Sequence, residues 1–284
     1  MPTPVPNDAR ELTKPPPWHG WVTADLFLSE LSSGTFVVVA VGQLSLGASL
    51  ERVTQVGFVL ALGAIILDLI CLVADLGDPA RFFHMLRRLK LRSPMSVGVW
   101  GISIYAMFAF ACAAMATARI GALAKTQLVV AAVGIVPALF VGLYKGVLFS
   151  TSAQPVWRDA RWLGTELSVS AGIIGAATML MAAMLVGANQ PITPLRTVLV
   201  TLSAVEIAAL ALFLYAAAPE IARRLGRRRY LFVYGTIGLG GLIAPGVIAA
   251  VTAEPIALLC ASMLALGGAL ASRHYLIILP HHDV

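Results

Sequence analysis

The sequence predicts an all-α membrane protein with eight transmembrane helices, and three observations support this fold class. Of its 284 residues, 59% are hydrophobic and only 12% are charged, and the mean hydropathy is +0.87. A soluble domain carries about 25% charged residues, so this chain has apolar surface that needs lipid as its solvent. The apolar runs are also continuous, whereas the strands of a membrane barrel alternate apolar and polar residues.

Eight apolar segments are each long enough to cross a bilayer, since a span needs about 20 mostly apolar residues. Short polar breaks separate them, the least distinct being Glu254-Pro255, and the longest polar connection is 75–96. The predicted spans are 26–48, 54–75, 97–118, 126–149, 165–187, 196–218, 231–252 and 256–279.

Residues 1–17 form a polar, proline-rich segment before the first span. They lack the short apolar core and small-residue cleavage site of a signal peptide. We therefore expect an extended, weakly ordered tail that leads into the membrane.

Basic residues are distributed unequally between the two ends of the predicted bundle. Eight spans put both termini and the even-numbered loops on one face, which receives sixteen of the 20 Lys and Arg residues. The other face holds Arg52, Arg119, Lys125 and Arg196. The positive-inside rule then places both termini in the cytoplasm, in a multi-pass protein of the cytoplasmic (inner) membrane. The same asymmetry explains the net charge of +6 without a nucleic-acid partner.

The cysteines and histidines do not form a pattern typical of a metal centre. Cys71, Cys112 and Cys260 lie singly in three different spans, so we expect small core residues and no iron–sulfur cluster or metal site in this chain. None of the five histidines falls in the middle of a span, which argues against a bis-histidine haem. Any redox role must use a diffusible cofactor and the centres of a partner.

Ionisable residues gather toward the basic end of the predicted bundle. Such groups are costly inside spans, so each is a candidate for function. They are Asp25 and Glu30 in span 1, Asp68 and Asp75 in span 2, Tyr144 and Lys145 in span 4, Glu166 in span 5 and, near mid-span, Glu206 in span 6. Quinol oxidation needs an apolar slot, hydrogen-bond partners for two oxygens and groups that accept two protons. By intrinsic pKa, His19 is the best single proton carrier.

Several motifs resemble those of the NrfD/PsrC family, the membrane subunits of polysulfide-reductase-like complexes. DLGDPARF (75–82) and SPMSVGVW (93–100) carry the resemblance most specifically. YKGVLFSTSAQPVW (144–157) and GGALASRHYLI (267–277) follow in the family's order, so the resemblance covers about 260 residues.

The resemblance implies two four-helix bundles, over 18–152 and 153–284, with no haem. It implies a quinone site near the start of the first span, next to a docked iron–sulfur (ferredoxin-like) subunit that commonly serves a molybdopterin-type catalytic subunit. The quinone would be menaquinone or ubiquinone.

The predicted residues fall into three groups. The quinone-binding group is His19, Asp25, Glu30, Tyr144 and Asp75. The proton-path group is Asp68, Glu166 and Glu206. The partner-docking group, in the 75–96 loop, is Arg81, His84, Arg87, Arg88 and Ser93. The sequence departs from the family pattern at Glu30, where a small residue is usual, and at Asp25, where an aromatic residue or histidine is commoner.

Two other functions are compatible with the residues. Buried Asp68 and Glu206, with Gly- and Pro-interrupted spans 4 and 7, would suit a secondary transporter or ion-conducting protein. A passive membrane anchor without quinone chemistry would recruit a soluble enzyme and bind no quinone. The family's partner often lies outside the membrane on the N-terminal face, whereas the basic residues predict that this face is cytoplasmic.

Overall fold

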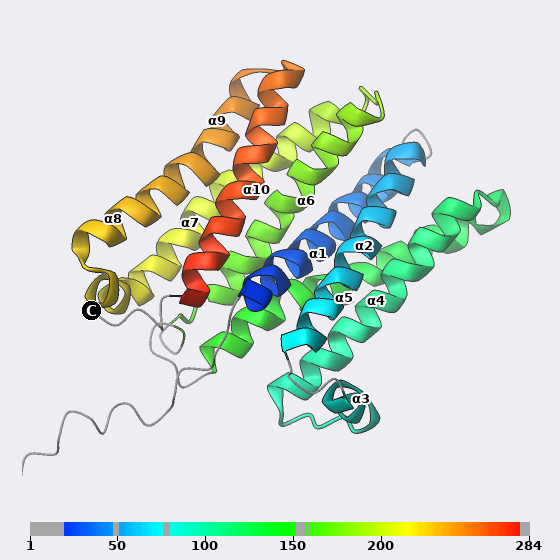
Figure 1. The fold of residues 1–284 in the computed structure, drawn as a ribbon. Helices are drawn as coiled ribbons and strands as arrows, with labels where there is room; N and C mark the ends of the chain where they lie inside the picture. The colour runs from blue at the N-terminus through cyan, green and yellow to red at the C-terminus, as the bar shows by residue number, and fades with distance from the viewer. Residues whose placement is uncertain (1–19, 48–50, 76–79, 152–156, 158–159, 279–284) are drawn as a thin grey trace, which may run out of the picture.

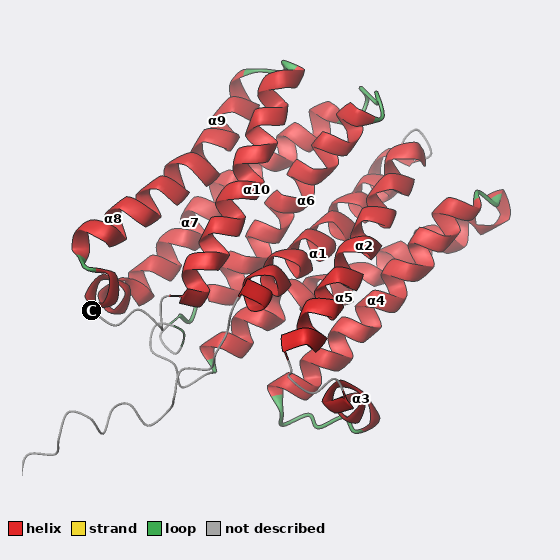
Figure 2. Ribbon diagram, viewed as in Figure 1, coloured by secondary structure: helices red, strands yellow, loops and turns green. Residues whose placement is uncertain are grey.

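The computed structural model describes residues 20–47, 51–75, 80–151, 157 and 160–278, and this part of the chain is helical without strands (Figure 2). Eight of its helical segments are long and apolar enough to cross a membrane, which confirms the predicted class. The helices are α1 (Gly20–Leu46), α2 (Glu51–Asp75), α3 (Ala80–Arg87), α4 (Pro94–Ala118), η3 (Gly121–Leu123), α5 (Ala124–Ser150), α6 (Leu163–Leu185), α7 (Ile192–Leu225), α8 (Arg227–Thr236), η4 (Ile237–Ile243), α9 (Ala244–Val251) and α10 (Pro255–Ile278).

The spans agree with the sequence prediction except in three places. The first helix begins at Gly20, so Asp25 already lies inside it. The sixth span, α7, continues to Leu225 through Pro219. The seventh span joins α8, η4 and α9, and η4 is a π-helix over the sequence IGLGGLI. Such π segments are rare and often occur at functional sites.

All spans alternate in direction, and we call the end where α1 begins the N-terminal face. The start of α1, the end of α10 and the short helix α3 lie at this end (Figure 1). Helix α1 packs against α2, α5, α6 and α10 and is the most central element. Because α1 packs against α6 across the expected boundary between bundles, the division into two four-helix bundles is not confirmed.

Small residues let the central helices approach closely. A side chain at Gly34 of α1 would collide with the backbone of Ala171 in α6, and one at Gly175 would collide with Gly34. The last helix meets η4 at Gly268 and Gly241 in the same way. Close contact through small residues is the usual way for helices to associate in lipid, where burial of apolar surface supplies little driving force.

A buried polar contact also ties α1 to its neighbours. The Ser32 hydroxyl donates to the Ala61 carbonyl of α2 over 2.6 Å and lies 2.7 Å from the Tyr105 hydroxyl of α4. Sequence reasoning did not identify this link, because a serine in an apolar helix carries no pattern of its own.

The SPMSVGVW motif builds the start of α4. Ser93 caps the helix by accepting from the Ser96 N–H over 3.4 Å, and Pro94 occupies the first turn. The Ser96 hydroxyl accepts from the Lys90 N–H at 3.0 Å, while Trp100 Nε1 donates to the Met85 carbonyl at 3.3 Å. The motif therefore fixes the connection that carries α3.

Large apolar side chains face outward along the spans, as a lipid-exposed surface requires. Of the three cysteines, Cys71 and Cys112 are buried, but Cys260 is exposed on α10. The expectation that all three are core residues was therefore wrong for Cys260, because its position on α10 faces away from the neighbouring helices.

Candidate functional site

A first buried cluster, which we call the lysine cluster, joins Asp25 of α1, Asp68 of α2 and Lys145 of α5. Lys145 Nζ lies 2.9 Å from Asp25 Oδ2 and 2.8 Å from Asp68 Oδ1. It also donates to the Asp25 backbone carbonyl over 2.7 Å, so all three ammonium donors are used. Asp68 is fully buried, and the other two residues are at least 92% buried. One cation thus holds three helices together.

The lysine cluster contains one more carboxylate than it has cations. Asp25 Oδ1 and Asp68 Oδ2 are buried and have no hydrogen-bond partner among the described residues. An uncompensated buried charge costs several kcal/mol, and a proton on either carboxylate would neutralise the cluster. The arrangement is therefore suited to accepting and releasing a proton.

A second buried cluster, the arginine cluster, joins Glu30 of α1, Glu166 of α6 and Arg273 of α10, with Glu206 of α7 beside them. Arg273 Nε and Nη2 donate to Glu30 over 2.8–3.1 Å, and Nη1 donates to Glu166 Oε1 over 3.1 Å. The forked guanidinium suits two carboxylates at once. All four residues are at least 96% buried.

Glu206 borders a small cavity beside the arginine cluster. The cavity has a volume of about 30 Å³, and its lining includes Glu166, Glu206, Arg273 and Gly241 of the π-helix. Glu206 Oε2 has no hydrogen-bond partner among the described residues. The space is large enough for a single water molecule with polar partners. Three carboxylates surround one cation here, so the carboxylates of this cluster can also accept protons.

The two observed clusters group the residues differently from the three groups predicted from the sequence. Asp25 and Glu30 were both predicted to bind quinone, but five residues rotate an α-helix by about 140°, so they point to different neighbours. Asp25 shares the cation Lys145 with Asp68, and Glu30 shares Arg273 with Glu166. Asp68 and Glu166 are both residues predicted for the proton path.

Neither of the cations that organise the two clusters was assigned to one of the three predicted groups, although Lys145 was named among the candidate ionisable residues. The sequence does contain a signal for Lys145, because a lysine inside an apolar span needs an anionic partner, which points to a buried ion pair. The signal from Arg273 was weaker, since it lies only five residues before the end of α10 and was counted among the basic residues of one face.

Tyr144 lies beside the lysine cluster and packs against the SPMSVGVW motif. A Cβ added at Gly98 would be 1.8 Å from Tyr144 Cζ, so only glycine leaves room for this ring. The ring also stacks on Phe140, with centroids 5.6 Å apart. The motif glycine therefore positions the tyrosine that was predicted to contact quinone.

The remaining predicted residues lie nearer the N-terminal face. Asp75 is exposed at the end of α2, and His84, Arg87 and Arg88 are exposed on or just after α3. His84 Nδ1 contacts the Ala80 carbonyl of the same helix. Ser93 acts as the cap described above. His19 and the side chain of Arg81 lie outside the part that the structure describes.

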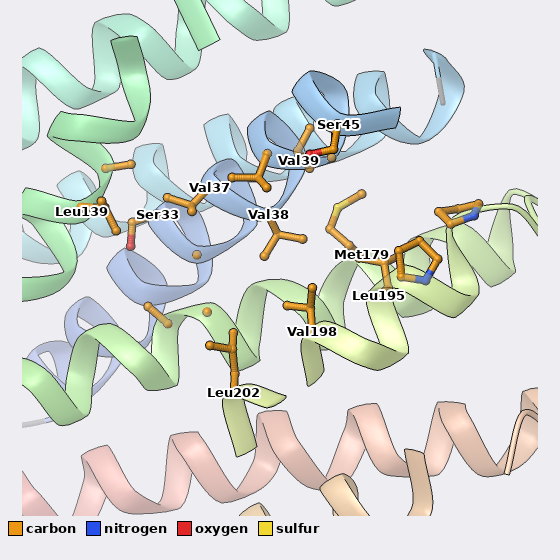
Figure 3. Close-up of a pocket in the computed structure, with 18 of the residues that line it drawn as sticks. Ser33, Val37, Val38, Val39, Ser45, Leu139, Met179, Leu195, Val198 and Leu202 are labelled. Atoms are coloured by element: carbon orange, nitrogen blue, oxygen red, sulfur yellow. The ribbon is translucent and has the colours of Figure 1, made fainter. Parts of the chain in front are cut away.

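An apolar groove of about 550 Å³ lies between α1, α5, α6 and α7, with α2 at one end. Figure 3 shows its lining, with Ser33 and Leu139 toward one end and Ser45 and Leu195 toward the other. Almost all of its surface is apolar. Its volume falls within the range of sites that hold small organic molecules.

A family model described as "Polysulphide reductase, NrfD" matches residues 6–281. The match covers nearly the whole chain, so the chain belongs to this family. No curated protein matches the chain.

Proposed function

We propose that this NrfD-family chain is the quinone-reactive membrane subunit of a respiratory oxidoreductase complex. It would exchange electrons between menaquinone or ubiquinone and a docked iron–sulfur subunit, which in turn would serve a molybdopterin-type catalytic subunit. Oxidation of one quinol breaks two O–H bonds, passes two electrons to the iron–sulfur partner and releases two protons. Quinone reduction is the reverse.

One observation carries the proposal: two buried clusters with excess carboxylates lie in the half of a membrane bundle that adjoins the N-terminal face. The chain offers buried carboxylates as proton acceptors in a bundle that also has an apolar groove. Family membership supports a membrane subunit of a reductase complex. Proton transfer through Asp68, Glu166 and Glu206 is part of this proposal.

The complex purified from its native membrane provides the test. Quinol-dependent reduction of the partner is measured for wild type and for Asp25→Asn and Tyr144→Phe. We expect at least a tenfold loss in Asp25→Asn, because a proton acceptor contributes 10²- to 10⁴-fold in typical enzymes. Tyr215→Phe is the matched control, since Tyr215 is 86% exposed on α7.

Unchanged turnover in both variants would refute the site assignment. A complex that neither binds quinone nor reacts with quinol would favour the passive anchor. Ion flux through the purified chain in liposomes would favour the transporter.

The orientation of the chain is a separate part of the proposal. The excess of basic residues predicts that the N-terminal face, with α3, lies in the cytoplasm. An Arg229→Cys variant should then resist a membrane-impermeant maleimide in intact cells and react in inverted vesicles, because Arg229 is exposed on the same face and lies outside the predicted partner-docking group. The opposite pattern would place the partner outside the cytoplasm.

A further inference from the structure

A dense group of arginines lies where α7 meets α8, at the N-terminal face of the bundle (Figure 1). Positions 223–229 read RRLGRRR, and we call this segment the basic corner. Helix α7 ends at Leu225, and α8 begins at Arg227, so Gly226 alone separates the two helices. The arginines are therefore held on the last turn of one helix and the first turn of the next, rather than on a long loop.

The basic corner has far more positive than negative charge. Residues 207–253 contain five arginines and a single carboxylate, Glu220. Glu220 is paired with Arg223. Arg228 and Arg229 are exposed and form no ion pair with any other residue that the structure describes. At least two guanidinium groups are thus available to an external anion.

Exposed apolar side chains lie one helical turn from these arginines, further into the membrane. Phe232 follows Arg228 by four residues and Arg229 by three, so it lies on the same face of α8. Phe232 is 71% exposed, and Leu231 beside it is 58% exposed. Helix α8 lies at the edge of the bundle, where it packs against α7 and continues into η4 (Figure 1). Positive charge and apolar surface therefore share one outward face.

We propose that the basic corner binds the headgroup of an anionic phospholipid, with the acyl chains against Phe232 and Leu231. A guanidinium group donates two parallel hydrogen bonds to phosphate oxygens. An anionic lipid surface attracts each nearby arginine by about a fivefold gain in affinity. The order of groups also matches, because the charged headgroup lies at the water boundary and the hydrocarbon lies below it. This site is independent of the proposed quinone chemistry.

The positive-inside rule explains why basic residues are frequent on this face, but not their position beside exposed apolar side chains. The rule depends on the number of Lys and Arg residues near the ends of the spans, wherever their side chains point. An acidic surface of a soluble partner is the other possible anion. It would leave Phe232 uncovered, because this residue lies inside the span Arg228–Val251, below the level that a soluble partner reaches. A phospholipid covers both parts of the face.

Photolabelling of the intact complex in nanodiscs tests the site. The probe is phosphatidylglycerol with a diazirine group in one acyl chain, and mass spectrometry identifies the labelled peptides. A phosphatidylcholine probe with the same acyl chains is the comparison, because its choline cation removes the net negative charge. We expect phosphatidylglycerol to label the peptide that contains Leu231 and Phe232 at least about fivefold more strongly than phosphatidylcholine does.

Loss of the two exposed arginines should remove this preference. In the double variant Arg228→Gln with Arg229→Gln, we expect the two probes to label the peptide equally. The matched control is Arg52→Gln with Lys125→Gln, which removes the same charge from exposed positions on the opposite face and should retain the preference. All four side chains are exposed, and thermal unfolding confirms that both double variants are folded.

A third variant tests the contact with the acyl chains. Phe232→Ala should lower labelling of this peptide by both probes, because it removes the apolar surface below the arginines. Phe110→Ala, at a 62% exposed position on α4, is the control and should leave the labelling unchanged.

Four outcomes would overturn the inference. They are equal labelling by the two probes in wild type, and an unchanged preference in the double variant of the basic corner. Labelling that is present in the isolated chain but absent in the intact complex would show that a partner covers the basic corner. Loss of labelling on addition of inorganic phosphate would identify an anion site that does not select lipid. Quinol turnover is measured separately, so the proposed function stands or falls independently of these results.

Discussion

Arg273 on the last helix forms a bidentate ion pair with Glu30 on the first, although 243 positions separate them in the chain. Three nitrogen–oxygen contacts of 2.8–3.1 Å join the two side chains, and both residues are at least 98% buried. The pair connects α10 to α1, while the remaining guanidinium nitrogen reaches Glu166 on α6. A single side chain thus holds three helices at the level of the candidate site.

Replacing Arg273 by methionine should therefore destabilise the protein strongly. The substitution leaves Glu30 and Glu166 buried without a cation, and breaking a buried ion pair in this way costs about 3–5 kcal/mol. Arg273→Lys should fall between methionine and wild type, because lysine keeps the charge but lacks the fork. Equilibrium unfolding in mixed micelles measures the change. Arg228→Met, at an exposed position, is the control, and an equal effect there would contradict the prediction.

The lysine cluster should respond unequally to loss of its cation and of one anion. Lys145→Met leaves two buried carboxylates and should cost about 3–5 kcal/mol. Asp68→Asn leaves a one-to-one pair between Lys145 and Asp25, so we expect stability within about 1 kcal/mol of wild type. The free energies of unfolding of both variants, measured under the same conditions, test this difference. If Asp68→Asn lowered the free energy of unfolding as much as Lys145→Met, the view that the cluster carries excess negative charge would be wrong.

Gly98→Ala should displace the Tyr144 ring. The new methyl group would occupy space that the ring fills, and overpacking of this kind costs about 1–3 kcal/mol. Tyr144→Ala in the same chain should recover much of that loss, because it removes the collision. Gly235→Ala provides the control, since a Cβ there meets nothing within 4 Å. Additive effects of Gly98→Ala and Tyr144→Ala would show that the two positions are not coupled.

Trp157→Phe should loosen the attachment of the segment before α6 to the end of α10. Trp157 is fully buried, and its Nε1–H donates to the Leu276 carbonyl over 2.9 Å. Loss of this donor leaves a buried carbonyl with one partner fewer, which costs about 1–3 kcal/mol. Thermal unfolding measures the change, and Trp162→Phe, at a 44% exposed position, should have little effect. Equal shifts in the two variants would refute a specific role for the hydrogen bond.

Much of the fold could be predicted from the sequence because crossing a membrane imposes local rules. Apolar run length located all eight spans, and the polar breaks marked their ends to within a few residues at most boundaries. The start of α1 and the end of α7 were the exceptions. Trp21 and Asp25 lowered the local apolar signal, although the helix continues through both. The π-helix in the seventh span could not be predicted, because Ile237–Ile243 is as apolar as an ordinary span.

The sequence by itself determined the membrane class, the number of spans, the family motifs and the end of the bundle where most of the ionisable groups gather. Each of these follows from residues that are close together in the chain. Only the tertiary structure decided that Asp25 pairs with Lys145, that Glu30 pairs with Arg273 and that a groove ends at Ser33. These pairings depend on how each helix is rotated about its axis. A helix that is apolar on all sides gives little indication of that rotation, so packing against its neighbours sets it.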